Sequence, residues 1–258
     1  QFRTGKLPEA AEMFGQASHL MPDFIDAFRE YGRTLGMVGR YQESVEAFDR
    51  VLSDLPQDLT ALYGQARAYD HMGAYKDAVA AYSRVNRVEP SCERAFFYKG
   101  FVYILLHQYD EAVDAFARTI EINPENAEAW QEKGKAFVIL EKFESAVKSF
   151  DGYLALQPEN ASIVFEKGLA LTKLEKTQEA LDAFIRCISL GMDTARVHAE
   201  LAYALFRLIR YDEALASLDR SIEHAADDAH VHLVRGECLM HLNRYADALV
   251  AFDAAITL

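Results

Sequence analysis

One pattern of residues recurs every 34 positions and aligns the whole 258-residue chain without an insertion or a deletion. In the copy at 127–160, Trp130 and Gly134 share one stripe, and Ala146 and Phe150 share a second. Residues three or four positions apart lie on the same face of a helix, so each copy predicts two amphipathic helices joined by a turn. We number the unit from 1, and its seven full copies start at Ile25, Leu59, Glu93, Ala127, Ala161, Ala195 and Ala229.

Two positions of this unit carry only small residues, and a third carries large apolar ones. Two helix backbones can approach closely only where side chains are small, and a large side chain then fills the space beside the crossing. Position 8 holds Gly32, Ala66, Gly100, Gly134, Gly168, Ala202 and Gly236. Position 20 holds Ala10, Ser44, Ala78, Ala112, Ala146, Ala180, Ala214 and Ala248. Position 24 holds Phe14, Phe48, Tyr82, Phe116, Phe150, Phe184, Leu218 and Phe252.

The ends of the expected helices are marked by residues that stop, cap or turn a chain. Asn126 and Asn160 can cap the helices that follow them, Pro8 suits the first turn of a helix, and Gly39 and Gly73 suit a left-handed turn. Proline ends a helix because it lacks a backbone N–H. Five of the six prolines occupy position 32, namely Pro22, Pro56, Pro90, Pro124 and Pro158. In the later copies the left-handed turn position is held by His107, Glu141, Glu175, Ile209 and Asn243.

These columns resemble the tetratricopeptide repeat (TPR) family, whose unit is a 34-residue helix–turn–helix. Trp130 matches the family's tryptophan at position 4. The resemblance implies an all-α, right-handed α-solenoid of stacked antiparallel helix pairs with about 15 helices. We expect a single solenoid over 1–258, with first helices at positions 1–14 of the unit and second helices at 18–31. Its parts are a half repeat at 2–22 and full repeats at 25–58, 59–92, 93–126, 127–160, 161–194, 195–228 and 229–258.

Composition limits the possible partners and location of the protein. The formal net charge of −13 argues against broad binding to nucleic acid or anionic membranes, and no apolar run approaches the ~20 residues of a membrane span. Of the three cysteines, Cys187 and Cys238 are at inner-facing positions and Cys92 is in an inter-repeat turn, which suggests structural, reduced thiols and an intracellular, cytoplasmic location.

The sequence also predicts a non-catalytic protein without cofactor or metal. Its glycines follow the repeat instead of forming a phosphate-binding loop, and no serine–histidine–acid arrangement can be argued. His230, His232 and His241 with Glu237 form the densest histidine group. Only Glu237 and His241 are spaced to face one metal, so ordinary polar lining is the favoured interpretation.

The TPR resemblance implies a concave groove lined by positions 2, 5, 9, 12 and 13 of the first helices. These positions hold eight basic and four acidic residues, a net charge of +4 in a chain of −13. The middle of the lining is apolar, and its side chains can be either partner contacts or core. We expect the groove to bind a peptide or protein segment with acidic and apolar groups. The predicted contact residues are Arg29, Arg33, Tyr63, Arg67, Phe97, Phe101, Gln131, Lys135, Phe165, Leu169, Tyr203 and Arg207.

Two other functions fit the same sequence. The chain could be the regulatory or substrate-recruiting arm of a larger enzyme, or a self-associating structural module. The last expected helix, 246–258, carries Phe252, Ala255 and Ile256 toward a neighbour that the sequence does not supply. Solenoids usually end in a polar cap, so we expect either a longer natural chain or ends that dock onto other molecules.

Overall fold

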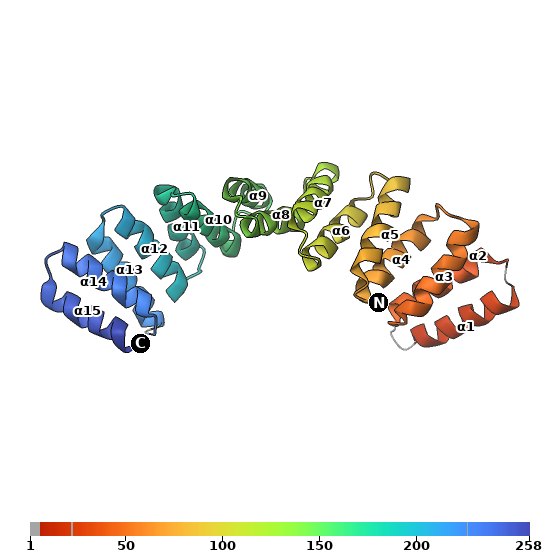
Figure 1. Cartoon of the computed structure of the whole chain (residues 1–258), viewed down its shortest axis with the longest axis horizontal. Helices are drawn as coiled ribbons and strands as arrows, with labels where there is room; N and C mark the ends of the chain where they lie inside the picture. The colour runs from red at the N-terminus through yellow and green to blue at the C-terminus, as the bar shows by residue number, and fades with distance from the viewer. Residues whose placement is uncertain (1–5, 22, 226) are drawn as a thin grey trace. The chain divides into compact units, whose positions relative to one another are not determined.

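The computed structural model describes residues 6–21, 23–225 and 227–258, and within them it contains fifteen α-helices and no strand (Figure 1). The chain divides into two compact units, residues 1–129 and residues 130–258. The helices of the first unit are α1 (Leu7–Leu20), α2 (Ile25–Met37), α3 (Tyr41–Asp54), α4 (Leu59–His71), α5 (Tyr75–Val88), α6 (Glu93–Leu105) and α7 (Tyr109–Ile122). Helix α8 (Ala127–Ile139) spans the division. The second unit continues with α9 (Phe143–Leu156), α10 (Ala161–Lys173), α11 (Thr177–Ser189), α12 (Ala195–Arg207), α13 (Tyr211–His224), α14 (Ala229–His241) and α15 (Tyr245–Thr257).

The 34-residue period is confirmed, since α2, α4, α6, α8, α10, α12 and α14 begin at the seven expected positions. The second helices begin at position 17 of the unit, one residue earlier than expected. Helix α1 is a second helix without a described first helix. The expected residues 2–5 of this half repeat, and Pro22, lie outside the described residues.

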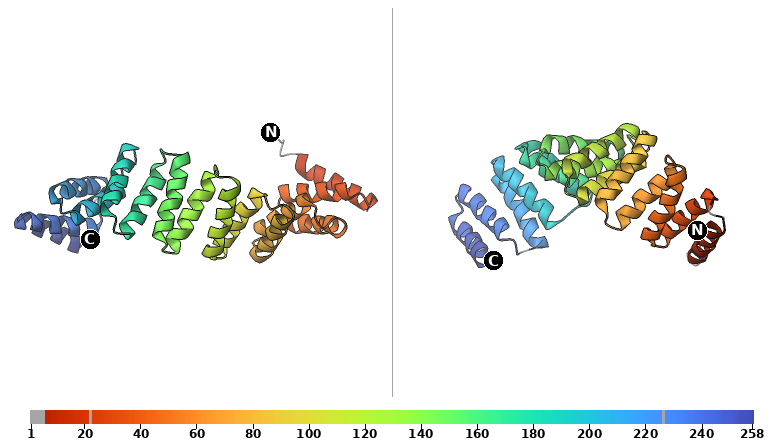
Figure 2. Two further views of the ribbon diagram at one scale, coloured as in Figure 1. Left: turned by 90° about the horizontal axis from the view of Figure 1, so that it is seen from above. Right: turned by 45° about the vertical axis from the view of Figure 1, so that its right-hand side comes forward.

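Within each unit, a first helix packs against its own second helix, and successive pairs lie side by side (Figures 1 and 2). In the first unit α3 contacts α4 and α5 contacts α6; in the second, α9 contacts α10, α11 contacts α12 and α13 contacts α14. The largest buried side chains are those of position 24. In the first unit they include Phe48, Tyr82 and Phe116, and in the second Phe150 and Phe184.

Position 8 is small because the ring at position 24 of the same repeat packs directly on the helix backbone. A Cβ atom added to Gly32 would lie 2.9 Å from Phe48, and one added to Gly134 would lie 2.5 Å from Phe150. Distances below 3.0 Å are not found between real atoms of this kind. The small-residue column therefore follows from close packing inside each helix pair.

The predicted caps and turns are also present. The side chains of Asn126 and Asn160 accept hydrogen bonds from the backbone N–H groups of Ala129 and Ile163, and Pro8 lies in the first turn of α1. Gly39 and Gly73 adopt the left-handed φ values of +83° and +74°. The five other residues at this position have φ values of +57°, +56°, +58°, +64° and +59°, in the order His107, Glu141, Glu175, Ile209 and Asn243.

No helix in the described part of the chain combines the length and the apolar character that crossing a lipid bilayer requires.

Ile209 is the turn residue least suited to its backbone conformation. A β-branched side chain is strained at φ = +64°, whereas asparagine adopts the left-handed region readily. The side chain is 71% exposed, so its removal costs little buried surface. We expect Ile209→Asn to raise the free energy of unfolding by about 1 kcal/mol in urea denaturation. The reciprocal control, Asn243→Ile, should lower it. Equal midpoints for wild type and Ile209→Asn would contradict the strain at this turn.

Tyr82 buries a hydroxyl group that has no hydrogen-bond partner among the described residues. Its ring is fully buried, and that burial raises the pKa of the phenol above its usual value. An unsatisfied buried polar group costs roughly 1–3 kcal/mol, so Tyr82→Phe should increase stability by about 1 kcal/mol. The matched control is Phe116→Tyr, which adds a hydroxyl to the same column and should destabilise. Thermal melting compares the two, and a loss of stability in Tyr82→Phe would show that the hydroxyl is hydrogen-bonded to buried water.

Candidate functional site

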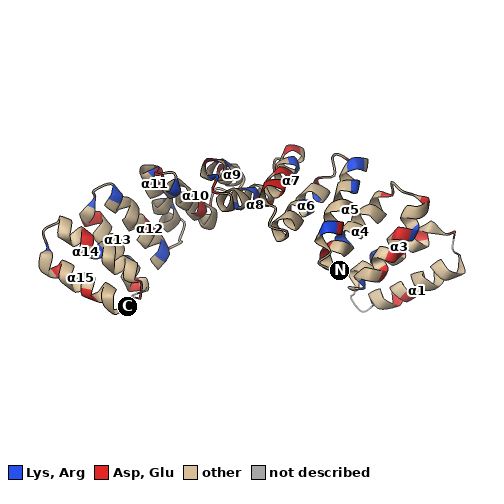
Figure 3. Cartoon of the chain, viewed as in Figure 1, with Lys and Arg blue, Asp and Glu red and all other residues tan. Residues whose placement is uncertain are grey.

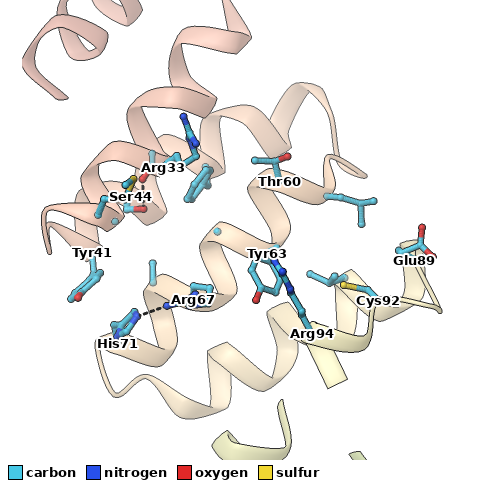
Figure 4. Close-up of a pocket in the computed structure, with 18 residues that line it drawn as sticks. Arg33, Tyr41, Ser44, Thr60, Tyr63, Arg67, His71, Glu89, Cys92 and Arg94 are labelled. Carbon is cyan, nitrogen blue, oxygen red and sulfur yellow. Dashed lines mark hydrogen bonds between the residues drawn. The ribbon is translucent and has the colours of Figure 1, made fainter. Parts of the chain in front are cut away.

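A cleft of about 540 Å³ lies along α2 and α4 in the first unit (Figure 4). Helices α3 and α5 contribute to its walls, and the start of α6 adds one residue to its edge. Its apolar walls include Met37, Tyr41, Phe48, Leu59, Tyr63 and Val85. The arginine, histidine and glutamate residues in its lining are Arg33, Arg67, His71, Glu89 and Arg94. A cleft of this size suits a few side chains of a bound chain.

Two repeats carry glycine beside the cleft where the other repeats carry larger side chains. Gly36 occupies position 12 of its repeat, and Gly64 occupies position 6 of the next. The corresponding residues elsewhere include Ile104 and Phe206 at position 12, and Tyr98 at position 6. Both glycines line the cleft: Gly36 leaves open the space that a side chain would fill, whereas at Gly64 the Phe48 ring packs directly on the helix backbone.

Two arginines of the cleft, Arg67 and Arg94, have no carboxylate within salt-bridge distance among the described residues. Arg67 donates from Nη2 to Nε2 of His71 at 3.0 Å, and its guanidinium lies 5.2 Å from the ring centroid of Tyr98. The side chain of Arg94 is exposed. Within the described residues neither arginine forms a salt bridge, whereas Arg33 pairs with Glu30 at 2.5 Å. Arg67 and Arg94 can therefore offer guanidinium donors to an incoming carboxylate.

Tyr63 lies between these charges, and in Figure 4 its ring and the Arg94 side chain are drawn side by side. The ring is half-buried and meets the rings of Tyr82 and Tyr98 edge-on, with centroids 6.0 and 6.4 Å apart. Burial raises the pKa of the Tyr63 phenol, so the group stays neutral at physiological pH. It presents an aromatic face with a neutral hydroxyl to whatever enters the cleft.

Arg29, also expected to bind the partner, instead connects two helices of the fold. Its Nη2 and Nε atoms lie 2.7 and 3.0 Å from Oδ2 of Asp58, and it also pairs with Asp26. The other oxygen of Asp58 accepts a hydrogen bond from the backbone N–H of Ala61 and so caps α4. The charge of Arg29 is already compensated, so its place is in the helix contact and not in the cleft.

Phe97 and Phe101 lie on α6, outside the cleft. Their ring centroids are 5.0 Å apart, and they lie 6.1 and 5.4 Å from the ring of Phe116. Both are half-buried. Each ring therefore shares its surface between the core and the solvent.

In the second unit, the predicted contact residues differ in their exposure to solvent. Phe165 is only 4% exposed, with its ring 5.7 Å from that of Phe184 and the Arg196 guanidinium over it at 5.2 Å. Phe165 is one of the predicted contact residues, and the structure places its ring in the core. Gln131, Leu169 and Tyr203 are half-buried.

The two predicted cations of the second unit form ion pairs. Nζ of Lys135 lies 2.8 Å from Glu132, and Nη2 of Arg207 lies 3.4 Å from Glu175. Both pairs include an exposed or half-exposed side chain, where ion pairs contribute little and exchange readily with other partners.

The structure thus brings together Arg33, Tyr63 and Arg67 from the predicted set. Sequence reasoning missed the parts of the cleft that come from second helices and inter-repeat turns, namely Tyr41, Ser44, Glu89 and Cys92. The available signal was the pair of glycines in consecutive repeats, at position 12 in the first and position 6 in the second.

The fold and its repeats already define the class of protein. Helix pairs of one length, stacked on their neighbours within each unit, are the architecture of an α-solenoid. A family model described as tetratricopeptide repeat matches residues 132–186 and 199–258. A model described as anaphase-promoting complex, cyclosome, subunit 3 matches residues 37–119. The chain belongs to the tetratricopeptide repeat family.

Several solved structures share this fold. YrrB, described as a TPR protein with an unusual peptide-binding site, is 21% identical over 72% of this chain and 96% of its own, with a TM-score of 0.63. The MamA protein is 18% identical over 67% and 94%, with a TM-score of 0.61. A tetratricopeptide repeat protein from Parabacteroides merdae ATCC 43184 is 17% identical over 92% of both chains, with a TM-score of 0.56. No curated protein matches the chain in sequence.

The two glycines of the cleft give a matched test of its packing. A Cβ added at Gly64 would lie 2.4 Å from the buried Phe48 ring, whereas one added at Gly36 meets only Oγ of Ser44, at 3.4 Å. Gly64→Ala should destabilise by about 1–3 kcal/mol because it overpacks the site. Gly36→Ala should be neutral or stabilise by up to about 0.5–1 kcal/mol through helix propensity. Urea denaturation measures both, and similar losses for the two variants would contradict the packing described for the cleft.

Proposed function

We propose that the chain is a non-catalytic protein-interaction scaffold whose first unit binds a protein segment in the cleft along α2 and α4. One observation carries the proposal: an apolar cleft with two arginines, Arg67 and Arg94, that have no carboxylate partner among the described residues. A segment with a large apolar side chain beside a carboxylate matches both features.

The chemistry of such a segment divides between the two parts of the cleft. An apolar side chain placed against Met37, Leu59 and Val85 gains about 25 cal/mol for each Å² removed from water. A carboxylate beside it would receive charge-assisted hydrogen bonds from Arg67 or Arg94. Tyr63 offers a further aromatic contact and a neutral donor. The apolar contact supplies affinity, and the charge sets which segments are accepted.

The net charge of the chain supports an acidic segment over a nucleic acid. The protein carries −13 overall, and Figure 3 marks acidic residues along α3 and α7. They include Glu43 in the first turn of α3, and Asp110 and Glu111 in that of α7. A polyanion would meet this repulsion over a long stretch, whereas a short acidic segment in the cleft meets mainly arginine.

Other predicted contact residues would extend the binding surface beyond the cleft. Phe97 and Phe101 would extend the contact in the first unit, and Gln131, Lys135, Leu169, Tyr203 and Arg207 would supply contacts in the second unit. The recruiting arm of a larger enzyme would use the same cleft and differ only in the attached domain. The cytoplasmic location stays a prediction. All three cysteines are free, and Cys187 and Cys238 are buried.

Self-association is a second proposal, favoured by the last helix. Leu249, Val250 and Ile256 on α15 are 63%, 66% and 81% exposed. Exposed apolar side chains gathered on one helix are typical of a surface that pairs with another molecule.

The cleft proposal is tested with peptides selected from a random displayed library on the full chain and then synthesised with a fluorophore. We expect enrichment of a large apolar residue next to Asp or Glu. The Arg67→Gln and Arg94→Gln double variant should weaken binding by at least about 10–100-fold in fluorescence anisotropy, since the loss of even one charged hydrogen bond costs roughly 1.5–3 kcal/mol.

Two further variants complete this test. Gly36→Leu should fill the cleft and remove binding, and Arg220→Gln, an exposed residue of α13 in the second unit, should leave it unchanged. Circular dichroism checks that each variant is folded. Selected peptides that bind the double variant and Gly36→Leu as tightly as wild type would exclude the cleft as the binding site.

A further inference from the structure

A group of three metal-ligating side chains lies in the second unit, apart from the cleft. Asp193 is in the turn between α11 and α12, His198 is in the first turns of α12, and His224 is the last residue of α13. One ligand atom of each lies within 4.8 Å of the other two. We propose that Asp193, His198 and His224 bind a divalent transition-metal ion, with zinc as the representative.

Both imidazoles are aimed at the same carboxylate. Oδ1 of Asp193 lies 2.6 Å from Nε2 of His198 and 3.4 Å from Nε2 of His224. The two rings are nearly parallel, with centroids 5.8 Å apart and planes at 15°. Two Nε2 atoms and one carboxylate oxygen thus converge on one point, although they come from two helices and a turn.

The ligand set and its spacing suit zinc. Two histidines and one carboxylate form a common set for zinc and other first-row divalent ions. With bonds of about 2.0–2.2 Å in a tetrahedral site, neighbouring ligand atoms lie about 3.3–3.6 Å apart. The Asp193–His224 distance of 3.4 Å already fits this value. The Asp193–His198 distance must widen by about 0.7 Å to approach it, and the Asp193 side chain, 58% exposed, is free to move.

The turn that supplies Asp193 departs from the repeat. The preceding repeats place proline at position 32, whereas this one has Met192 there, and Gly191 turns the chain with φ = +85°. The N-cap of α12 is Thr194, whose hydroxyl accepts a hydrogen bond from the backbone N–H of Val197. Asp193 is therefore not needed as a cap, and its carboxylate is available to the histidines.

The buried side of His198 sets the expected strength. The His198 side chain is 11% exposed, and its Nδ1 atom has no hydrogen-bond partner among the described residues. When Nε2 holds a metal, Nδ1 carries the proton, and most metal-binding histidines donate that proton to an acceptor. A metal site whose histidine lacks this acceptor binds its ion about 10–100-fold more weakly. We therefore expect micromolar binding, with further coordination positions left to solvent, because the protein supplies three ligands.

The experiment uses the full chain without an affinity tag, stripped with EDTA and exchanged into metal-free buffer at pH 7.5. Zinc is titrated by calorimetry, and Co²⁺ absorption reports the ligand environment. Wild type should bind one zinc ion, and its Tm should rise by about 5 °C at a hundredfold excess over Kd. His224→Ala and Asp193→Asn should each weaken binding at least tenfold and remove most of this shift. His230→Ala, which removes an exposed histidine of the same unit, should change neither.

Two outcomes overturn the proposal. One is a wild-type protein that binds zinc no more tightly than about 1 mM, which would show that the three side chains form only hydrogen bonds. The other is binding that persists unchanged in both His224→Ala and Asp193→Asn, which would place the ion elsewhere. Neither variant truncates a fully buried side chain, and circular dichroism checks that each retains its helices.

Discussion

The contact between a small residue of each first helix and the large side chain of its own second helix is the constraint on which every repeat depends. At Gly100, Gly168 and Gly236 an added Cβ would lie 2.7, 2.6 and 2.4 Å from the ring opposite. The two backbones are therefore held at one separation wherever the pair recurs. Because this contact is inside the helix pair, residues on the outer sides of the first helices can vary without changing the fold.

This arrangement explains why the fold could be predicted almost completely from the sequence. The columns that repeat are those that pack, and Phe48, Phe116 and Phe150 are fully or almost fully buried as their column required. Turn chemistry is local, so the caps at Asn126 and Asn160 could also be read from neighbouring residues. The start of the second helices was misjudged by one residue, which is the usual uncertainty at a helix end.

The candidate site was predicted less well because a count of side chains ignores how they pair. Arg29 was counted as a free cation, but its partner Asp58 is 29 residues away and lies at the start of another helix. Phe165 occupies a lining position, yet its ring turns inward to Phe184. Arg67 remains without a carboxylate partner, and no feature of its own repeat distinguishes it from Arg29. Pairing across repeats depends on rotamers and distances, which periodicity does not encode.

Both candidate sites lie where the chain departs from its own repeat. The cleft is present where Gly36 and Gly64 replace larger side chains, and the histidine–carboxylate cluster is present where a turn lacks proline and contains Asp193. A column that fixes the helix separation cannot change without loss of stability, so chemistry specific to one repeat has to use positions outside those columns. Within a chain of similar units, the irregular positions are therefore the first to inspect for binding, since the regular ones are already committed to packing.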